Sequence, residues 1–283
     1  MTTIAQGPGL HEVARGVFGW IGPEGRTNAG FVTWDDGVLV VDSLYGSALV
    51  QGLWEQIRSV TDRPVRYVID THEHWDHCFG NQYFDAALFI GHENCRRSMT
   101  ERPEALRDFG VQSMLTRNLP ALADEFRVVQ ILPPLVTYAE SMTVYAGKRP
   151  VELRYLGRAH TAGDTVVWLP EERIALTGDL FVSGRSPYAG DGYPRAWISA
   201  LRRLEQLSPQ SLIPGHGDLG TAADVGTLRD WMEGAVSTLD AARARGLKRE
   251  QAQQELQIGV PEGWPNPQGG MDLIAPYYRE AGA

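Results

Sequence analysis

The stretch that decides the fold is Thr71-His72-Glu73-His74-Trp75-Asp76-His77. It places three histidines and an aspartate close together, directly after the apolar run 65–70, which is typical of a strand. Neutral imidazole and carboxylate are ligands that zinc and similar metals prefer in proteins. A lone His-x-His motif is a weak signal, because histidine has many roles. Four such side chains at the end of one strand predict a metal site whose other ligands lie elsewhere in the chain.

Length and composition are those of an ordinary folded protein. The 283 residues suffice for a large core in one domain or two, and the hydrophobic and charged fractions are 43% and 22%. The formal charge of −9 argues against a general nucleic-acid binder, which needs a basic surface. We therefore expect a small-molecule substrate and no nucleic-acid partner.

Cysteine content and the amino terminus bear on location. Cys78 and Cys95 are too few for a disulfide scaffold, which favours a reducing compartment. Residues 1–9 have neither the basic nor the apolar region of a signal peptide, and no run is long enough to span a bilayer. We expect a cytoplasmic protein without a membrane partner. Beside the histidine cluster, Cys78 is expected to pack rather than to bind metal.

The first part of the chain reads as strands and one helix. Segment 13–21 is predicted as one strand, and 30–34 and 38–41 as a hairpin around Asp35-Asp36-Gly37. Residues 47–60 carry apolar side chains at helical spacing, with Ser47 as the expected N-cap. The strand 65–70 then delivers the histidines to a loop at its carboxyl end, where ligands usually bind in α/β sheets.

Later segments repeat this pattern. Strands are predicted at 141–145, 151–156, 165–169 and 173–177, and helices at 195–207 and 222–246. Two strand-rich halves with flanking helices predict an αββα sandwich of two mixed β-sheets, in the α+β class. We expect a single domain over residues 1–283, with a helical insertion at about 93–128 that flanks the site. A carboxyl-terminal helix and tail at about 222–283 would cover core surface, the pocket or a dimer contact.

Three further turns each present one metal-binding side chain. His160 lies in the Gly-rich stretch 157–164, Asp179 follows the predicted strand 173–177, and His216 lies in Pro214-Gly215-His216-Gly217. Small neighbours leave room for close approach to a metal ion. Each turn alone is modest evidence, but together they complete a set of imidazole and carboxylate donors. His92, by contrast, has no ligand spaced beside it and is predicted to be structural.

In this order, the donors resemble the complete ligand set of the metallo-β-lactamase-fold superfamily. The match runs from about residue 10 to about residue 220, and that family has an αββα fold with its site at one edge of the sandwich. The resemblance implies two metal sites made of these residues: His72, His74 and His160 for the first, Asp76, His77 and His216 for the second, and Asp179 as the bridge.

The expected chemistry follows from that donor set. Two Zn²⁺ per chain, with Fe or Mn as alternatives, would share a bridging hydroxide, because zinc lowers the pKa of bound water to about 7. Asp76 would be catalytic, orienting the hydroxide or moving a proton. The expected activity is that of a zinc-dependent hydrolase attacking an activated carbonyl in a thioester, a lactone or other ester, or a β-lactam.

Departures from the lactamases narrow this expectation. Lactamases of the first subclass carry Cys where this chain has Asp179, and a residue other than His at His77. Those of the third subclass lack the bridging aspartate. The donor set is similar to that of glyoxalase II and lactonases, and the overall run looks like polyketide thioesterase-cyclases. Beta-lactam opening is therefore expected to be weak or incidental.

Two other activities remain open on the same scaffold. A mononuclear iron sulfur dioxygenase would use the same donors, since imidazole and carboxylate also suit iron. A phosphodiesterase or nuclease is less favoured, because the chain is acidic and has no large insertion after residue 180. For the substrate wall we favour the Gly- and Pro-rich loop 183–195. Its Arg185 or Arg195 could hold an anionic group, although a role as surface arginine is the commoner case. A homodimer is possible.

Overall fold

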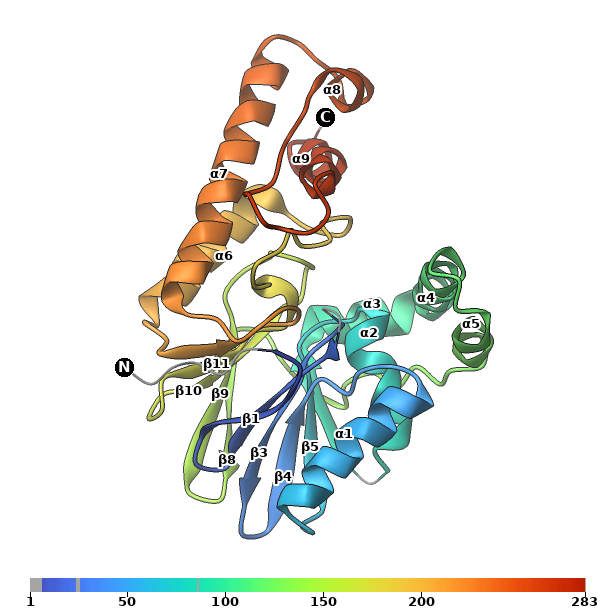
Figure 1. Ribbon diagram of the computed structural model, residues 1–283, viewed down its shortest axis with the longest axis vertical. Helices are drawn as coiled ribbons and strands as arrows, with labels where there is room; N and C mark the ends of the chain where they lie inside the picture. Colours follow the sequence, from blue (N-terminus) through green and yellow to red (C-terminus); the bar gives the residue numbers. More distant parts are fainter. Residues whose placement is uncertain (1–6, 24–25, 86, 283) are drawn as a thin grey trace.

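Two β-sheets face each other at the centre of the molecule, and helices cover their outer faces (Figure 1). The computed structural model describes residues 7–23, 26–85 and 87–282. This arrangement confirms the predicted αββα sandwich. The expectation that residues 1–9 form no signal peptide concerns a segment of which residues 1–6 lie outside the described residues. The single-domain organisation stays a prediction.

The first sheet has the strand order β1-β2-β3-β4-β5-β6-β7. Its strands are β1 (Gly9–Ala14), β2 (Val17–Ile21), β3 (Ala29–Trp34), β4 (Gly37–Val41), β5 (Val65–Asp70), β6 (Leu88–His92) and β7 (Val136–Tyr138). Strands β1 to β4 are antiparallel, whereas β4 to β7 run parallel. Since parallel strands end at the same edge, β4 and β5 deliver their carboxyl ends side by side.

The second sheet has the order β12-β11-β10-β9-β8. Its strands are β8 (Ser141–Ala146), β9 (Arg149–Tyr155), β10 (Thr165–Leu169), β11 (Ile174–Leu176) and β12 (Ser211–Ile213). Strands β11 and β12 are parallel, so they also end together. At that edge the backbone N–H of Thr165 donates to the carbonyl of Thr71 over 2.8 Å, which joins the two sheets.

Helices fill the space around the sheets. They are α1 (Ser47–Val60), α2 (Trp75–Cys78), η2 (Phe79–Tyr83), α3 (Glu93–Glu101), α4 (Pro103–Thr116), α5 (Pro120–Arg127), η3 (Gly178–Leu180), α6 (Pro194–Gln206), α7 (Ala222–Ala244), α8 (Arg249–Glu255), η4 (Gly269–Leu273) and α9 (Ile274–Glu280). Helix α1 buries Val50, Leu53 and Ile57 against the first sheet. Helices α6, α7 and α9 form one apolar cluster over the second sheet.

The core between the sheets explains why the strands read as apolar runs. Val32, Leu39 and Val41 of the first sheet meet Leu153 and Val167 of the second in one buried cluster. Strands β4 and β10 are buried along their whole length, because each has the other sheet on one face and helices on the other. Among the described residues, no helix is both long and apolar enough to cross a membrane.

Two local predictions were wrong, and two short strands were missed. The predicted strand 13–21 is a hairpin of β1 and β2, because Gly16 takes a left-handed φ of 72° and turns the chain. Ser47 is not the N-cap of α1; Gly46 occupies that position, and the Ser47 amide donates to the Glu125 carboxylate. Strands β7 and β12 were not predicted, since three residues carry too little periodicity.

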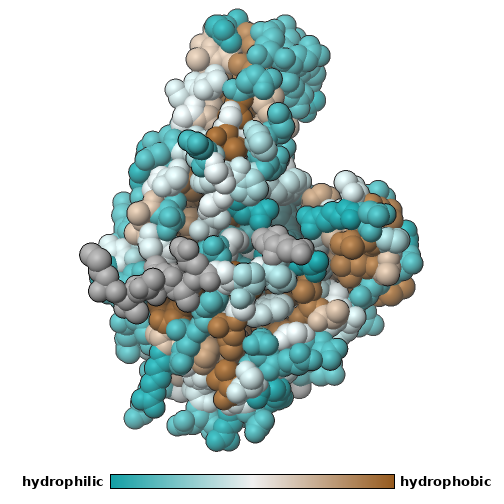
Figure 2. Space-filling view, viewed as in Figure 1, coloured by the Kyte–Doolittle hydropathy of each residue, from teal (hydrophilic) through white to brown (hydrophobic). Residues whose placement is uncertain are grey.

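Apolar and polar surfaces are distributed unevenly (Figure 2). The face shown is largely hydrophilic, with apolar side chains gathered on the lobe formed by α4 and α5. In and beside that lobe, Leu115, Leu119 and Val128 are exposed. The predicted homodimer stays a prediction.

A close backbone contact locks the segment after β4 against the start of η2. The Gly80 amide donates to the carbonyl of Leu44, and a Cβ at Gly80 would lie 2.0 Å from the carbonyl oxygen of Ser43. We expect Gly80→Ala to lower the free energy of unfolding by about 1–3 kcal/mol, because backbone atoms cannot move aside cheaply. Urea unfolding of the purified variant measures this.

Gly52→Ala is the matched control. Gly52 lies inside α1, and a Cβ there meets only Trp20 at 3.7 Å, an ordinary contact. The variant should be neutral or more stable by up to about 1 kcal/mol, since alanine is the better helix former. Equal effects at the two glycines would contradict the close contact at Gly80.

Candidate metal centre

The histidine cluster occupies the junction between β5 and α2. His72 follows the end of β5, and His74 is the N-cap of α2, whose first turn contains Asp76 and His77. The backbone is extended at His74 and becomes helical from residue 75. Asp76 and His77 therefore lie on a helical turn, whereas His72 and His74 lie on the extended segment before it.

The structure brings all seven predicted residues together. Three overlapping groups have ligand atoms within 4.8 Å of one another: His72, His74 and His160; His72, His77 and Asp179; and Asp76, His77 and His216. The remaining ligands come from the other sheet, because His160 precedes β10, Asp179 lies in η3 after β11, and His216 follows β12. Their role as metal ligands stays a prediction that this geometry supports.

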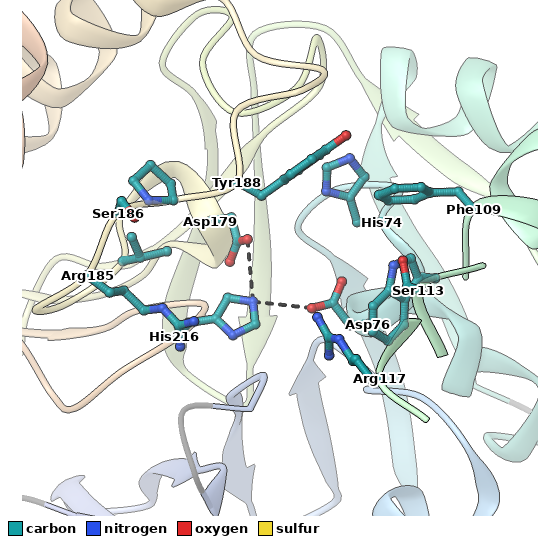
Figure 3. A pocket seen from close by; sticks show the side chains of 13 residues that line it. His74, Asp76, Phe109, Ser113, Arg117, Asp179, Arg185, Ser186, Tyr188 and His216 are labelled. Carbon is teal, nitrogen blue, oxygen red and sulfur yellow. Dashed lines mark ion pairs between the residues drawn. The ribbon is translucent and has the colours of Figure 1, made fainter. Parts of the chain in front are cut away.

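Asp179 lies between the two groups. Its Oδ1 is 3.3 Å from His77 Nε2, and its Oδ2 is 3.5 Å from both His160 Nε2 and His216 Nε2. Figure 3 shows His216 between Asp179 and Asp76, whose Oδ2 is 3.2 Å from the same Nε2. Asp179 therefore occupies the position that a carboxylate bridging two metal ions would require.

Unpaired buried atoms support a metal site. Among the described residues, the buried atoms His72 Nε2, His77 Nε2 and Asp179 Oδ1 make no hydrogen bond of good geometry, although the last two lie 3.3 Å apart. A buried polar atom without a partner is costly, and natural proteins rarely tolerate several in one place. A divalent cation would satisfy all three atoms, and the mixture of imidazole and carboxylate suits zinc or iron.

Burial and neighbouring charge set the protonation of the donors. Burial lowers the pKa of His160 to about 3 and that of His72 well below its ordinary value. Burial alone would raise the pKa of Asp179, but the charges of His216, His77 and His160 outweigh it and leave that pKa well below normal. His72 and His160 are therefore neutral and Asp179 is ionised at pH 7, and these are the forms that bind a metal cation.

Asp42 supports this cluster from behind, and sequence reasoning did not identify it. One carboxylate oxygen accepts a hydrogen bond from the Thr71 amide over 2.8 Å, and the other lies 2.7 Å from His77 Nδ1. Asp42 follows β4 directly and has a left-handed φ of 63°. Such a contact holds the ring so that its Nε2 faces the cluster, as outer carboxylates do for metal-binding histidines.

Asp191 contacts a predicted ligand from the opposite side and was likewise missed. Its Oδ2 lies 3.1 Å from His74 Nε2, while His74 Nδ1 lies 2.8 Å from His160 Nε2. The hydrogen bond with His74 lowers the pKa of Asp191 to about 2. A lone aspartate in a glycine-rich loop carries no sequence signal, since only the fold brings it to residue 74.

A cavity of about 290 Å³ opens onto these residues. Its wall consists of His74, Trp75, Asp76, Phe109, Ser113, Arg117, Asp179, Val182, Arg185, Ser186, Pro187, Tyr188 and His216. The loop predicted as substrate wall therefore lines it through residues 185–188, and helix α4 of the helical insertion forms the facing side (Figure 3). In Figure 2 the surface is indented between the α4–α5 lobe and the carboxyl-terminal helices.

Some residues considered for this wall lie elsewhere. Arg195 does not line the cavity and pairs instead with Asp240. Arg117, which follows α4, takes a place in the wall that sequence reasoning did not anticipate, and its guanidinium stacks over the Trp75 ring at 5.3 Å. The cationic wall therefore consists of Arg117 and Arg185.

A second cavity of about 190 Å³ adjoins the first. His74, Phe109 and Tyr188 line both cavities. The rings of Phe109 and Tyr188 stand 5.6 Å apart between centroids, one from α4 and one from the opposite loop. Arg102 and Asp191 line only the second cavity.

Two side chains near the cluster have structural roles, as predicted. His92 Nε2 donates to the carbonyl of Ala139, and His92 Nδ1 accepts from the amide of Asn94. Its ring stacks on Tyr155 at 4.1 Å. Cys78 is fully buried in an apolar cluster, and burial raises the pKa of its thiol well above the ordinary value.

Comparison with known proteins agrees with this geometry. The model of the metallo-β-lactamase superfamily matches residues 22–216, which include every residue of the cluster. The chain belongs to the metallo-β-lactamase superfamily.

Individual relatives are distant. A metallo-β-lactamase type 2 from Elizabethkingia meningoseptica is 24% identical over 202 residues, covering 70% of this chain and 71% of that protein. The alpha subunit of 2,4-dinitroanisole O-demethylase from Nocardioides sp. (strain JS1661) is 27% identical over 215 residues, covering 74% of this chain and 58% of that protein.

Solved structures share the fold. The stereoselective inverting sec-alkylsulfatase Pisa1 from Pseudomonas sp. has a TM-score of 0.76 at 14% identity, covering 96% of this chain but half, 50%, of that one. The DIM-1 metallo-β-lactamase has a TM-score of 0.63 at 20% identity, covering 81% of this chain and 99% of that one. At these identities the likeness shows the fold alone.

Metal binding should release protons. Burial lowers the pKa of His216, but Asp179 and Asp76 outweigh it and raise that pKa to about 9. The metal-free protein therefore carries a proton there at pH 7, and a metal ion must displace it. We expect zinc affinity to rise with pH up to about 9 and to fall on acidification. Titration calorimetry in two buffers of different ionisation enthalpy counts the protons. Equal heats in both buffers, with constant affinity between pH 6 and 8, would contradict this.

Proposed function

We propose that the protein is a zinc-dependent hydrolase that attacks an activated carbonyl in a small-molecule substrate: a thioester, a lactone or other ester, or a β-lactam. Membership in the metallo-β-lactamase superfamily supports a metal-dependent hydrolase. The observation that carries the proposal is the cluster itself, in which seven His and Asp donors form overlapping groups at one edge of the sandwich.

The donors divide into two metal sites. His72, His74 and His160 would hold the first metal ion, and Asp76, His77 and His216 the second, with Asp179 contacting both groups. Three neutral imidazoles leave an open position on a tetrahedral zinc. When bound, the metal pair would lower the pKa of bound water and polarise the carbonyl oxygen of the substrate.

Asp76 is placed to handle the proton of the attacking water. Its carboxylate lines the cavity, and Oδ2 accepts a hydrogen bond from Thr27 Oγ1 over 2.8 Å. His77 and His216 hold the pKa of Asp76 below its ordinary value although burial opposes them, so the group is ionised at neutral pH. An ionised carboxylate fixed by a hydroxyl donor can orient water and accept its proton.

The walls of the cavity favour a small, anionic substrate with an apolar portion. Its volume of about 290 Å³ lies at the low end for ligand pockets. Arg117 and Arg185 enter from different walls, and Phe109 and Tyr188 present aromatic surface (Figure 3). Guanidinium groups bind carboxylates well, because the planar fork matches the anion.

Elemental analysis and a substrate panel test the proposal. Protein purified without added metal should contain about two zinc ions per chain, as two-metal sites do. The panel holds one thioester, one lactone and one chromogenic β-lactam, together with 2,4-dinitroanisole and a secondary alkyl sulfate, after the names of two relatives. Turnover of an acyl substrate that chelation abolishes and zinc restores is the expected result. About one iron per chain without hydrolysis would favour the dioxygenase alternative instead.

Single substitutions separate the site from the rest of the chain. Asp76→Ala should lower kcat by about 10²–10⁴-fold, the range for loss of a proton-transfer group. His11→Ala is the control and should retain zinc and activity, since the His11 ring bonds to the Gly7 carbonyl and is not one of the clustered donors. Unchanged kcat in the Asp76 variant would contradict its assigned role.

Arg117→Ala tests the charge of the substrate. For an anionic substrate we expect KM to rise about 10-fold, matching the loss of one hydrogen bond to a charged group. A neutral analogue of the same shape should show no change. Arg127→Ala is the control, because Arg127 pairs with Asp124 at the surface and does not line the cavity. An equal KM increase for both substrates would show that Arg117 acts through packing.

A further inference from the structure

The carboxyl-terminal helix α9 contacts the loop that touches the candidate metal centre. The superfamily match ends at residue 216, so α9 lies outside it. In Figure 1 this helix lies against α6 and α7, away from the two sheets. Yet its last turn faces loop 187–193. Pro187 and Tyr188 of this loop line the cavity, and Asp191 lies further along it.

Arg279 hydrogen-bonds to the backbone of the loop on both sides of Asp191. Its Nη1 donates to the carbonyl of Gly190 and its Nη2 to the carbonyl of Gly192, each over 2.7 Å. The same guanidinium lies over the Tyr193 ring at 5.8 Å. Two donors in a rigid planar fork fix two peptide groups relative to each other. Because glycines flank Asp191, the loop has little stiffness of its own there.

Asp191 connects the loop held by Arg279 to the candidate metal centre. Its carboxylate reaches His74 Nε2 over 3.1 Å, while His74 Nδ1 faces His160 Nε2. A carboxylate on the outer nitrogen of a ligand histidine fixes the orientation of the ring and its tautomer. Asp191 is 46% exposed, so the contact depends on how the loop is held rather than on burial.

A second contact from α9 holds the far end of the loop. The Glu280 carboxylate accepts hydrogen bonds from the amides of Arg195, over 2.8 Å, and Ala196, over 3.0 Å. These are amides of the first turn of α6, which have no partner inside their own helix. Arg279 and Glu280 together therefore tie the loop and the start of α6 to the same helix.

We propose that Arg279 is a positioning residue for the metal centre. It holds the backbone on either side of Asp191 so that this carboxylate orients His74 toward the metal. The inference rests on the proposed function only in assuming that the cluster binds metal. It gives the carboxyl-terminal segment a task in metal binding, in addition to covering the core of the second sheet.

Zinc affinity of the full-length chain, measured by competition with a chromophoric chelator, tests this. Asp191→Asn should weaken the site containing His74 by about 10–100-fold, as loss of an outer carboxylate does. Arg279→Ala should weaken the same site by about 10-fold, within the same range. The Co²⁺-substituted protein should show an altered visible spectrum in both variants, because the geometry of a ligand changes.

A double-mutant cycle distinguishes positioning from general stability. If Arg279 acts through Asp191, the double variant binds zinc no more weakly than Asp191→Asn alone. Arg279→Lys should fail to restore affinity, since lysine has the charge but not the fork. Arg243→Ala is the matched control; Arg243 also donates to a carboxyl-terminal carbonyl, that of Ala281, but does not contact the loop.

Each outcome is decisive. Unchanged zinc affinity and Co²⁺ spectrum in Arg279→Ala would overturn the inference, as would additive effects in the cycle or full rescue by lysine. Equal losses in the Arg243 variant would assign the effect to folding of the tail. Absence of metal binding by the unmodified chain would instead contradict the proposed function.

Discussion

Burying imidazoles and carboxylates together is the constraint on which this structure depends. Asp179 is only 5% exposed and lies among three histidines, and His72, His77 and His160 are fully buried. Such a cluster is costly to remove from water unless opposite charges or a cation offset the desolvation. The two sheets make it feasible, because parallel strands in each end at the same edge and bring together donors far apart in the chain.

The candidate metal centre and the walls of the cavity come from different parts of the molecule. The donors of the candidate centre lie on strand ends and short turns at one edge of the sandwich. A Cβ at Gly215 would lie 2.0 Å from Asp179 Oδ1. The cavity walls come from α4 and from loop 185–188, which lie outside the two sheets.

The parts that were predictable are those whose signal is local. The spacing of His72, His74, Asp76 and His77 and the apolar runs of β4 and β10 are visible in a few residues, and the fold followed from them. Asp42 and Asp191 were not found, because their significance is a contact with residues 35 and 117 positions away. Gly16 turns the chain within a run that reads as one strand, since alternation alone does not reveal a left-handed residue.

The aromatic pair between the two cavities has a consequence for the range of substrates. The rings of Phe109 and Tyr188 contact each other, and both contact the His74 ring. The two rings line both the cavity of about 290 Å³ and the cavity of about 190 Å³. Under the proposed function, the length of acyl chain that fits would be set by these two rings, which lie outside the cluster of donors.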